Sequence, residues 1–260
     1  RIVLHLIVAK RVIPTAGWFL CAYFITRSLE ELSMTQKKTL GIVAGLNRRA
    51  AMEVKTQLLA LGDDDLSVVM TEDNFKIDPD PVFAVSDRKI FIFNESELLA
   101  DMGVDLILVP DFKCGSYIHE IQREIQTPIL DMKSALMSQM GTEMPVMGVL
   151  DAGNASACVD GACDLSKQMK LVFPSEEETK VLDELREKIR AEGASDEAAQ
   201  TLAPICQHMV EKGAQVIVPN CTQFALNAAA LVKMGLPVMN VFEMFAKAAL
   251  THCTKKLPKP

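Results

Sequence analysis

The chain has 260 residues, of which 49% are hydrophobic and 23% charged, and its formal net charge at pH 7 is −7. This is the composition of a globular protein, and it excludes an intrinsically disordered chain. An acidic chain without a basic run does not favour binding to nucleic acid or to an anionic membrane. The seven irregularly spaced cysteines favour free thiols in a reducing, cytoplasmic compartment over a disulfide framework or a zinc site.

Residues 1–33 differ from the rest of the chain and contain its single tryptophan. The uncharged run at residues 12–26 is shorter than the ~20 apolar residues of a membrane span, and no small-residue cleavage site of a signal peptide follows it. Glu-Glu-Leu-Ser before Met34 can be encoded by a purine-rich ribosome-binding sequence next to a bacterial start codon. We therefore expect residues 1–33 to be a non-native upstream segment. Mass spectrometry of the native N-terminus tests this, since peptides from before Met34 would contradict it.

From Thr39 onward, apolar strands alternate with amphipathic helices. The strand in TLGIVAGL leads into a helix expected from about Ala50 to Leu61. Further strands are expected in LSVVMTED (66–73), VDLILVP (104–110), TPILDM (127–132), PVMGVLDAG (145–153), KLVFPS (170–175), AQVIVP (214–219) and LPVMNV (236–241). Continuous apolar strands alternating with helices indicate an α/β fold whose parallel sheets are covered on both faces. Ligands of such folds bind at the carboxyl ends of the strands.

Local signals mark several helix ends. Gly103 follows the helix in SELLADMG in the position typical of a glycine stop. Ser175 precedes three glutamates, which predicts an N-cap, and Gly193 is expected to end that charged helix. Helices are also expected in SYIHEIQREI (116–125) and LAPICQHMVEKG (202–213), with a closing helix after residue 241.

An internal repeat relates two parts of the chain. LILVPDF…IQTPILDM and VIVPNCT…MGLPVMNV share the order strand, turn, helix and proline-initiated strand. The separation from Phe112 to Pro128 equals that from Cys221 to Pro237, sixteen positions. This repeat predicts two similar halves facing each other across a cleft. Cys221 stands where a buried strand opens into a helix, a place well suited to chemistry.

These features resemble the aspartate/glutamate/hydantoin racemase family over nearly all of residues 34–260. The resemblance lies in the cysteine motif IVPNCTQ (217–223), the opening loop AGLNR (44–48), the small-residue turn AGNA (152–155) and NFKID (74–78). It implies two pseudo-symmetric flavodoxin-like halves, the first of about residues 34–105 plus 235–260 and the second of about 106–234. It also implies catalysis without pyridoxal phosphate or metal, and a homodimer.

The family places one cysteine of each half on either side of the substrate α-carbon, so that one thiolate removes a proton and the other thiol returns one. Cys221 matches the second of these cysteines. The first motif, Pro-Cys-Asn-Thr, reads Pro-Asp-Phe-Lys here, at residues 110–113. Family spacing puts Asp111 in the position of the missing thiol, the internal repeat puts Phe112 there, and a three-residue shift would bring in Cys114. Asp111 then serves either as the second acid–base group or as the N-cap of the following helix.

Polar residues near these motifs are candidates for substrate binding. Asn220 and Thr222 flank Cys221 and are suited to hydrogen-bond a substrate carboxylate, although helix capping accounts for them equally. Lys113 and Arg48 are cations at strand-to-helix turns that either hold a carboxylate or face solvent. The remaining two candidates are Asn47, in the opening loop, and Asn154, on a turn whose small residues allow close approach.

The sequence therefore predicts a cofactor-independent amino-acid racemase or epimerase acting on an acidic amino acid such as aspartate or glutamate. Two alternatives remain. The first is a single-cysteine lyase or isomerase of a dicarboxylate, and the second is an inactive protein that binds an acidic amino acid. We expect a small-molecule partner, a possible homodimer, and neither a nucleic acid nor a membrane partner.

Overall fold

The computed structural model describes residues 37–72, 81–115, 117–139, 146–152 and 170–254. The proposed upstream segment 1–33 lies outside these residues, as does Asn154. The described residues form two parallel sheets, which confirms the α/β fold expected from the sequence. The first sheet has the order β2-β1-β3-β4 and consists of β1 (Lys38–Ile42), β2 (Leu66–Met70), β3 (Leu106–Val109) and β4 (Ile129–Asp131).

The second sheet has the order β6-β5-β7 and consists of β5 (Met147–Leu150), β6 (Leu171–Val172) and β7 (Val216–Pro219). The strand predicted at residues 236–241 is reduced to a bridge between Val238 and Ile217. The backbone enters the closing helix α12 (Val241–Thr254) shortly after this bridge, so the pairing with β7 does not extend further. With this bridge, the second sheet repeats the strand order of the first.

The internal repeat has a structural counterpart in the strand registers. Ile107 of β3 pairs with Gly41 of β1, and Ile217 of β7 pairs with Gly148 of β5. Each isoleucine also donates its backbone N–H, at 2.8 Å, to the carbonyl of the proline that begins the next predicted strand. Ile107 and Ile217 therefore hold equivalent positions in the two sheets.

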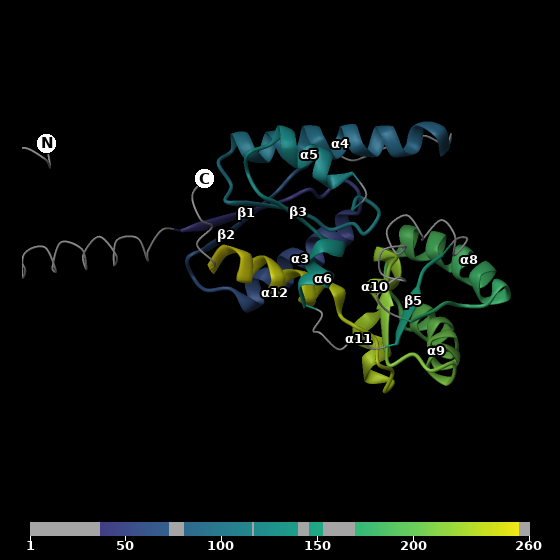
Figure 1. The fold of residues 1–260 in the computed structure, drawn as a ribbon. Helices are drawn as coiled ribbons and strands as arrows, with labels where there is room; N and C mark the ends of the chain where they lie inside the picture. The colour runs from purple at the N-terminus through teal and green to yellow at the C-terminus, as the bar shows by residue number, and fades with distance from the viewer. Residues whose placement is uncertain (1–36, 73–80, 116, 140–145, 153–169, 255–260) are drawn as a thin grey trace, which may run out of the picture. The chain divides into compact units, whose positions relative to one another are not determined.

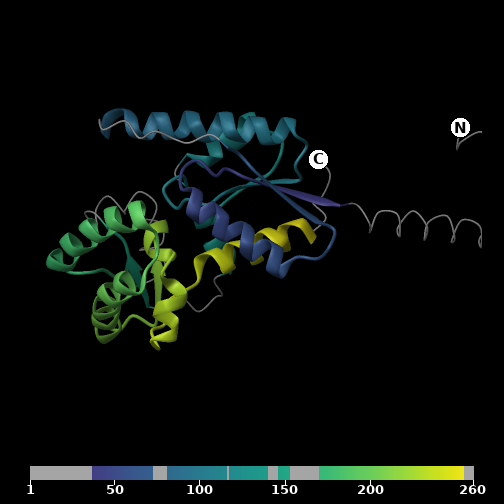
Figure 2. The same ribbon diagram turned by 180° about the vertical axis from the view of Figure 1, so that it is seen from behind.

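Helices cover both faces of the first sheet, as Figures 1 and 2 show from opposite sides. Alternate strand residues such as Leu40 and Leu108 share a buried cluster with α3 (Arg48–Leu61), α6 (Met132–Gln139) and α12. Ile107 and Val109 point the other way and pack with α4 (Pro81–Asp101) and α5 (Ile118–Glu124). This two-sided burial explains why the strands read as continuous apolar runs.

The second sheet packs against α8 (Glu176–Glu192) and α9 (Asp196–Glu211), with α10 (Thr222–Ala225) and α11 (Ala228–Lys233) following β7. The predicted start of α8 is confirmed, because the Ser175 hydroxyl accepts from the Glu178 N–H and the Glu178 carboxylate accepts from Ser175. Gly193 ends the helix with φ of 95°, and Gly103 follows α4 with φ of 75°. Both glycines adopt a backbone conformation that other residues avoid.

The division between the sheets falls between β4 and β5. The division between the halves expected near residue 105 does not coincide with the boundary between the sheets, because β3 and β4 pair within the first sheet. The internal repeat aligns β3 with β7. Neither strand is the first of its sheet, so the repeat does not show where a half begins. The closing helix α12 returns to the core of the first sheet, where Phe242 and Phe245 are buried. No helix in the described ranges is long and apolar enough to cross a membrane.

Candidate active site

Cys221 lies just beyond the carboxyl end of β7, where the extended backbone turns into α10. The residue is 6% exposed, and its thiol donates to the side-chain oxygen of Gln223 at 3.0 Å. The surrounding cluster includes Ile217 and Phe224. The residue thus lies at the end of a buried strand, as the sequence predicts.

The pKa of the Cys221 thiol is raised to about 11, first by burial and then by the negative charge of Asp151. Hydrogen bonds from the backbone of Gln223 and Phe224 lower it, as does the positive charge of Lys113. At neutral pH the group is therefore a thiol, which can donate a proton. The effect of Lys113 also places this first-sheet residue within electrostatic range of Cys221.

Asn220 ties the end of β7 to the end of β5. Its side-chain amide donates to Asp151 Oδ2 at 2.7 Å, and its backbone N–H donates to Leu150 O at 3.0 Å. Asp151 Oδ1 accepts from the backbone N–H of Ala152 at 2.8 Å. Since parallel strands present their carboxyl ends at one edge, these polar groups gather beside Cys221.

Asn47 and Thr222 join the first-sheet loop to the start of α10. Asn47 Nδ2 donates to Thr222 Oγ1 at 2.8 Å, while Asn47 Oδ1 caps α3 by accepting from the Ala50 N–H at 3.2 Å. A single amide thus begins one helix and reaches the residue next to Cys221. Two substrate-binding candidates from distant parts of the sequence are brought together here.

Asp111 forms an ion pair with Arg88 of α4, with 2.5 Å between Oδ2 and Nη1. The two side chains are only 13% and 20% exposed. Oδ1 accepts from the backbone N–H of Lys113 at 2.6 Å, a local bond typical of aspartate at a turn. The turn that carries Asp111 is thus tied to α4 by a half-buried ion pair.

The two other candidates for the position of the missing thiol are residues of the hydrophobic core. Phe112 and Cys114 are buried in the cores on opposite faces of the first sheet. The Cys114 thiol donates to the Asp111 carbonyl, and burial raises its pKa well above the ordinary value. Lys113 and Arg48 are exposed, as a cation that meets a substrate must be before it binds.

Residues 83–249, well over half of the chain, match the Asp/Glu/hydantoin racemase family. The chain belongs to this family. It is accordingly an isomerase of the racemase type, as the sequence analysis predicted.

Solved structures of racemases share the fold of this family member. An aspartate racemase homologue from Pyrococcus horikoshii aligns over 84% of this chain and 100% of its own, with a TM-score of 0.66 and 17% identity. A glutamate racemase from Francisella tularensis aligns over 86% of both chains, with a TM-score of 0.62 and 12% identity. An allantoin racemase from Klebsiella pneumoniae covers 83% of this chain and 87% of its own, with a TM-score of 0.61 and 12% identity. A search of curated protein sequences found no match. At these identities the likeness establishes the fold and leaves the substrate open.

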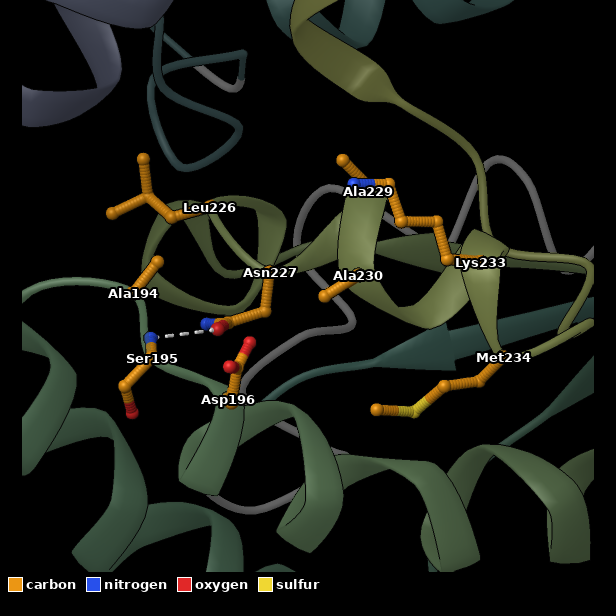
Figure 3. A pocket seen from close by; sticks show the side chains of 9 residues that line it. All are labelled: Ala194, Ser195, Asp196, Leu226, Asn227, Ala229, Ala230, Lys233 and Met234. Atoms are coloured by element: carbon orange, nitrogen blue, oxygen red, sulfur yellow. Dashed lines mark hydrogen bonds between the residues drawn. The ribbon is translucent and has the colours of Figure 1, made fainter.

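A separate pocket of about 430 Å³ lies between the start of α9 and the whole length of α11 (Figure 3). Asn227 accepts there from the backbone N–H of Ser195, beside Asp196. The pocket contains none of the residues around Cys221, and it is lined by Ala194, Ser195, Asp196, Leu226, Asn227, Ala229, Ala230, Lys233 and Met234. The candidate site at Cys221 is therefore distinct from this cavity.

Three residues around the candidate site were not predicted from the sequence. Asp151 follows β5 just as Asn220 follows β7. The expectation that ligands bind at the carboxyl ends of parallel strands therefore applies to Asp151 as well as to Asn220. Gln223 belongs to the quoted cysteine motif but received no role. Arg88 lies in the middle of α4, where nothing in the local sequence indicates a partner at residue 111.

Proposed function

We propose that this racemase inverts the α-carbon of an acidic amino acid such as aspartate or glutamate without pyridoxal phosphate or metal, using Cys221 and Asp111 as its acid–base pair. The observation that carries the proposal is the strand register. Asp111 follows Ile107 by four residues, and Cys221 follows Ile217 by four, while Ile107 and Ile217 are equivalent. This supports Asp111, rather than Phe112, as the counterpart of Cys221.

The proposed roles of the two groups are complementary. The carboxylate of Asp111 accepts the α-proton, so that the C–H bond breaks and an O–H bond forms. The thiol of Cys221 then protonates the opposite face of the carbanion, which forms a new C–H bond and leaves a thiolate. Asp111 then releases its proton to solvent and the Cys221 thiolate takes one up from solvent, which restores both groups before the next turnover in the same direction. The opposite enantiomer reacts with the already reversed pair.

The substrate carboxylates are assigned to the cations and amides around the pair. Lys113 is exposed, and its positive charge reaches Cys221. We propose that Lys113 and Arg48 hold the side-chain carboxylate, and that the α-carboxylate accepts hydrogen bonds from Asn220 and Thr222. The amides of Asn47 and Asn154 would complete the polar lining of the site.

A second reaction is favoured by one specific observation. The Asp111 carboxylate already satisfies Arg88 and the Lys113 N–H, and so is less available to a substrate than a free acid–base group. If Asp111 only positions this turn, Cys221 is the single acid–base group. Protonation from one face is then sufficient for a lyase or isomerase of a dicarboxylate, such as a decarboxylase of malonates.

The test is a substrate panel followed by chiral chromatography. The purified protein would be incubated with each enantiomer of aspartate, glutamate and allantoin, with Cys221→Ala as the control. Racemisation of aspartate or glutamate, lost in the control, is the expected result. Racemisation of allantoin alone would contradict the acidic substrate. Release of carbon dioxide from malonates without any racemisation would favour the lyase.

A cytoplasmic location and a homodimer complete the proposal, and both rest on the sequence. The location follows from the irregular free thiols, and the dimer from the family resemblance. Light scattering of the purified protein should give a mass near twice the 28.6 kDa of the chain. A monomeric mass at micromolar concentration would contradict the dimer.

A further inference from the structure

We infer that the pocket between the start of α9 and α11 is a binding site for a small α-amino acid with an apolar side chain. The inference goes beyond the proposed function and does not depend on it, because none of the residues around Cys221 lines this pocket. The volume of about 430 Å³ lies within the range of small-molecule sites, roughly 300–1,000 Å³.

The side chain of Asn227 is the observation that points to a ligand. It lines the pocket, is only 2% exposed, and accepts at Oδ1 from the backbone N–H of Ser195 at 3.2 Å. Its amide nitrogen Nδ2 is buried and has no hydrogen-bond acceptor among the described residues. A buried N–H donor that stays unpaired is costly, because it has lost its hydrogen bonds to water. A hydrogen-bond acceptor that enters the pocket would therefore be stabilised by Asn227.

Two groups of opposite charge line the same pocket. Asp196 is the first residue of α9, and Figure 3 shows its carboxylate pointing toward the Asn227 amide. Lys233 is the last residue of α11, and its side chain extends back along that helix (Figure 3). Both residues are exposed, and neither forms an ion pair with another described residue. The pocket thus offers an anion, a cation and an unpaired amide donor to one ligand.

A zwitterionic α-amino acid complements these three groups. Its ammonium can donate to Asp196, while its carboxylate accepts from Asn227 Nδ2 and pairs with Lys233. Since both charged groups of the ligand are attached to one carbon, they can meet side chains that lie next to each other. The rest of the lining is mostly apolar and includes Leu226 and Met234, and Lys233 is the one cation among the described residues of the lining. A second carboxylate would have no partner, so the ligand has an apolar side chain and differs from the acidic substrate proposed for the active site.

The experiment compares L-valine with two molecules that each lack one of its charged groups. Isovalerate keeps the carboxylate without the ammonium, and isobutylamine keeps the ammonium without the carboxylate. Each would be titrated into the ¹⁵N-labelled full chain without any substrate, and NMR would follow the side-chain amide signal of Asn227. We expect valine to shift this signal and to bind at least roughly threefold more tightly than either partial analogue.

Four variants test whether the binding is at this pocket. Lys233→Met and Asp196→Asn should each weaken the binding of valine roughly two- to fivefold, since each removes one charged partner that is exposed before the ligand binds. Lys180→Met and Asp101→Asn are the matched controls, exposed changes on α8 and α4, and both should bind valine as the wild type does.

Asn227→Asp tests the buried donor. It keeps an oxygen that accepts from the Ser195 N–H but removes the amide N–H groups, so valine should no longer shift the backbone N–H signals of Ala229 and Ala230. A wild type whose Asn227 amide signal does not move with valine would overturn the inference and leave water as the occupant of the pocket. Equal affinity for valine and isovalerate, or unchanged affinity in both Lys233→Met and Asp196→Asn, would also overturn it. Because no turnover is measured, failure of the proposed function would not affect these results.

Discussion

At the residue scale, the chemistry of the site depends on charges that lie far apart in the sequence. Lys113 and Asp151 act on one sulfur from two different sheets. Cys221 itself could be found from the sequence, because it stands where an apolar strand meets a helix. The ionic environment could not be found, because it depends on how the carboxyl ends of β3, β5 and β7 are brought together.

Lys113→Met removes the positive charge that lowers the pKa of Cys221. We predict that this pKa rises above about 11, so alkylation of Cys221 becomes slower at every pH below that value. The measurement is the rate of iodoacetamide labelling of the Cys221 peptide. Lys180→Met on the exposed face of α8 is the control. Equal rates in the wild type and Lys113→Met would show that the lysine does not act on the thiol.

At the element scale, helix ends join parts of the chain that are distant in sequence. Asn47 caps α3 and also binds Thr222 at the start of α10. Capping was predictable for Ser175, where the acidic first turn follows in the sequence. The partner of Asn47 was not, since the two residues are 175 positions apart.

We predict energetic coupling between Asn47 and Thr222. Asn47→Ser keeps a capping oxygen but does not reach Thr222, and Thr222→Val removes the hydroxyl at nearly constant shape. Each change loses the same hydrogen bond, so their effects on the free energy of unfolding should be non-additive by about 1 kcal/mol. Urea unfolding of the two single variants and the double variant measures this. Strictly additive effects would argue against the bond in solution.

Arg49 stabilises the end of α8 from the start of α3. Its guanidinium donates to the carbonyls of Ile189, Arg190 and Ala191 at 2.6–3.3 Å. These carbonyls belong to the last turn of α8, where cations are favourable. We predict that Arg49→Met lowers the free energy of unfolding by about 1 kcal/mol, a modest value because the residue is exposed. Arg48→Met, also exposed, should change it by less than about 0.5 kcal/mol. A thermal or urea unfolding series that ranks the two variants equally would contradict this role.

At the scale of the whole molecule, the α/β fold was predictable from the alternation of apolar strands and helices. Burial on both sheet faces makes the strands continuous apolar runs, which are easily recognised. The division between the sheets was harder to place, because β1 and β3 are neighbours in space but separated in the sequence by β2 and α4. Only the pairing of backbone groups across the sheet reveals it.

Buried thiols make the stability of the whole fold sensitive to alkaline pH. Burial, and secondly Glu178, raises the pKa of Cys206 to about 12. An unfolded cysteine titrates near about 8.5. Between these values the unfolded chain loses a proton that the native state keeps, so stability falls as pH rises, by up to about 1.4 kcal/mol per pH unit. Below about pH 8.5 both states hold the proton and the contribution is constant.

We predict that Cys206→Ala gives a shallower fall in the free energy of unfolding between about pH 9 and 10.5 than the wild type. Urea unfolding at several pH values measures the slope. Gln200→Ala, an exposed change on the same helix, should leave it unaltered. Parallel pH dependences in the wild type and Cys206→Ala would mean that the buried thiol does not account for alkaline sensitivity.

The most direct test of the central claim is exchange of the α-proton in D₂O, followed by proton NMR, for each enantiomer of the racemised substrate. The wild type should exchange both. Cys221→Ala and Asp111→Asn should each lose racemisation but retain slow exchange in one enantiomer, and the retained enantiomer should be opposite in the two variants. That pattern would place one group on each face of the α-carbon. Racemisation by Asp111→Asn at the wild-type rate would contradict the account and leave Cys221 to act without Asp111.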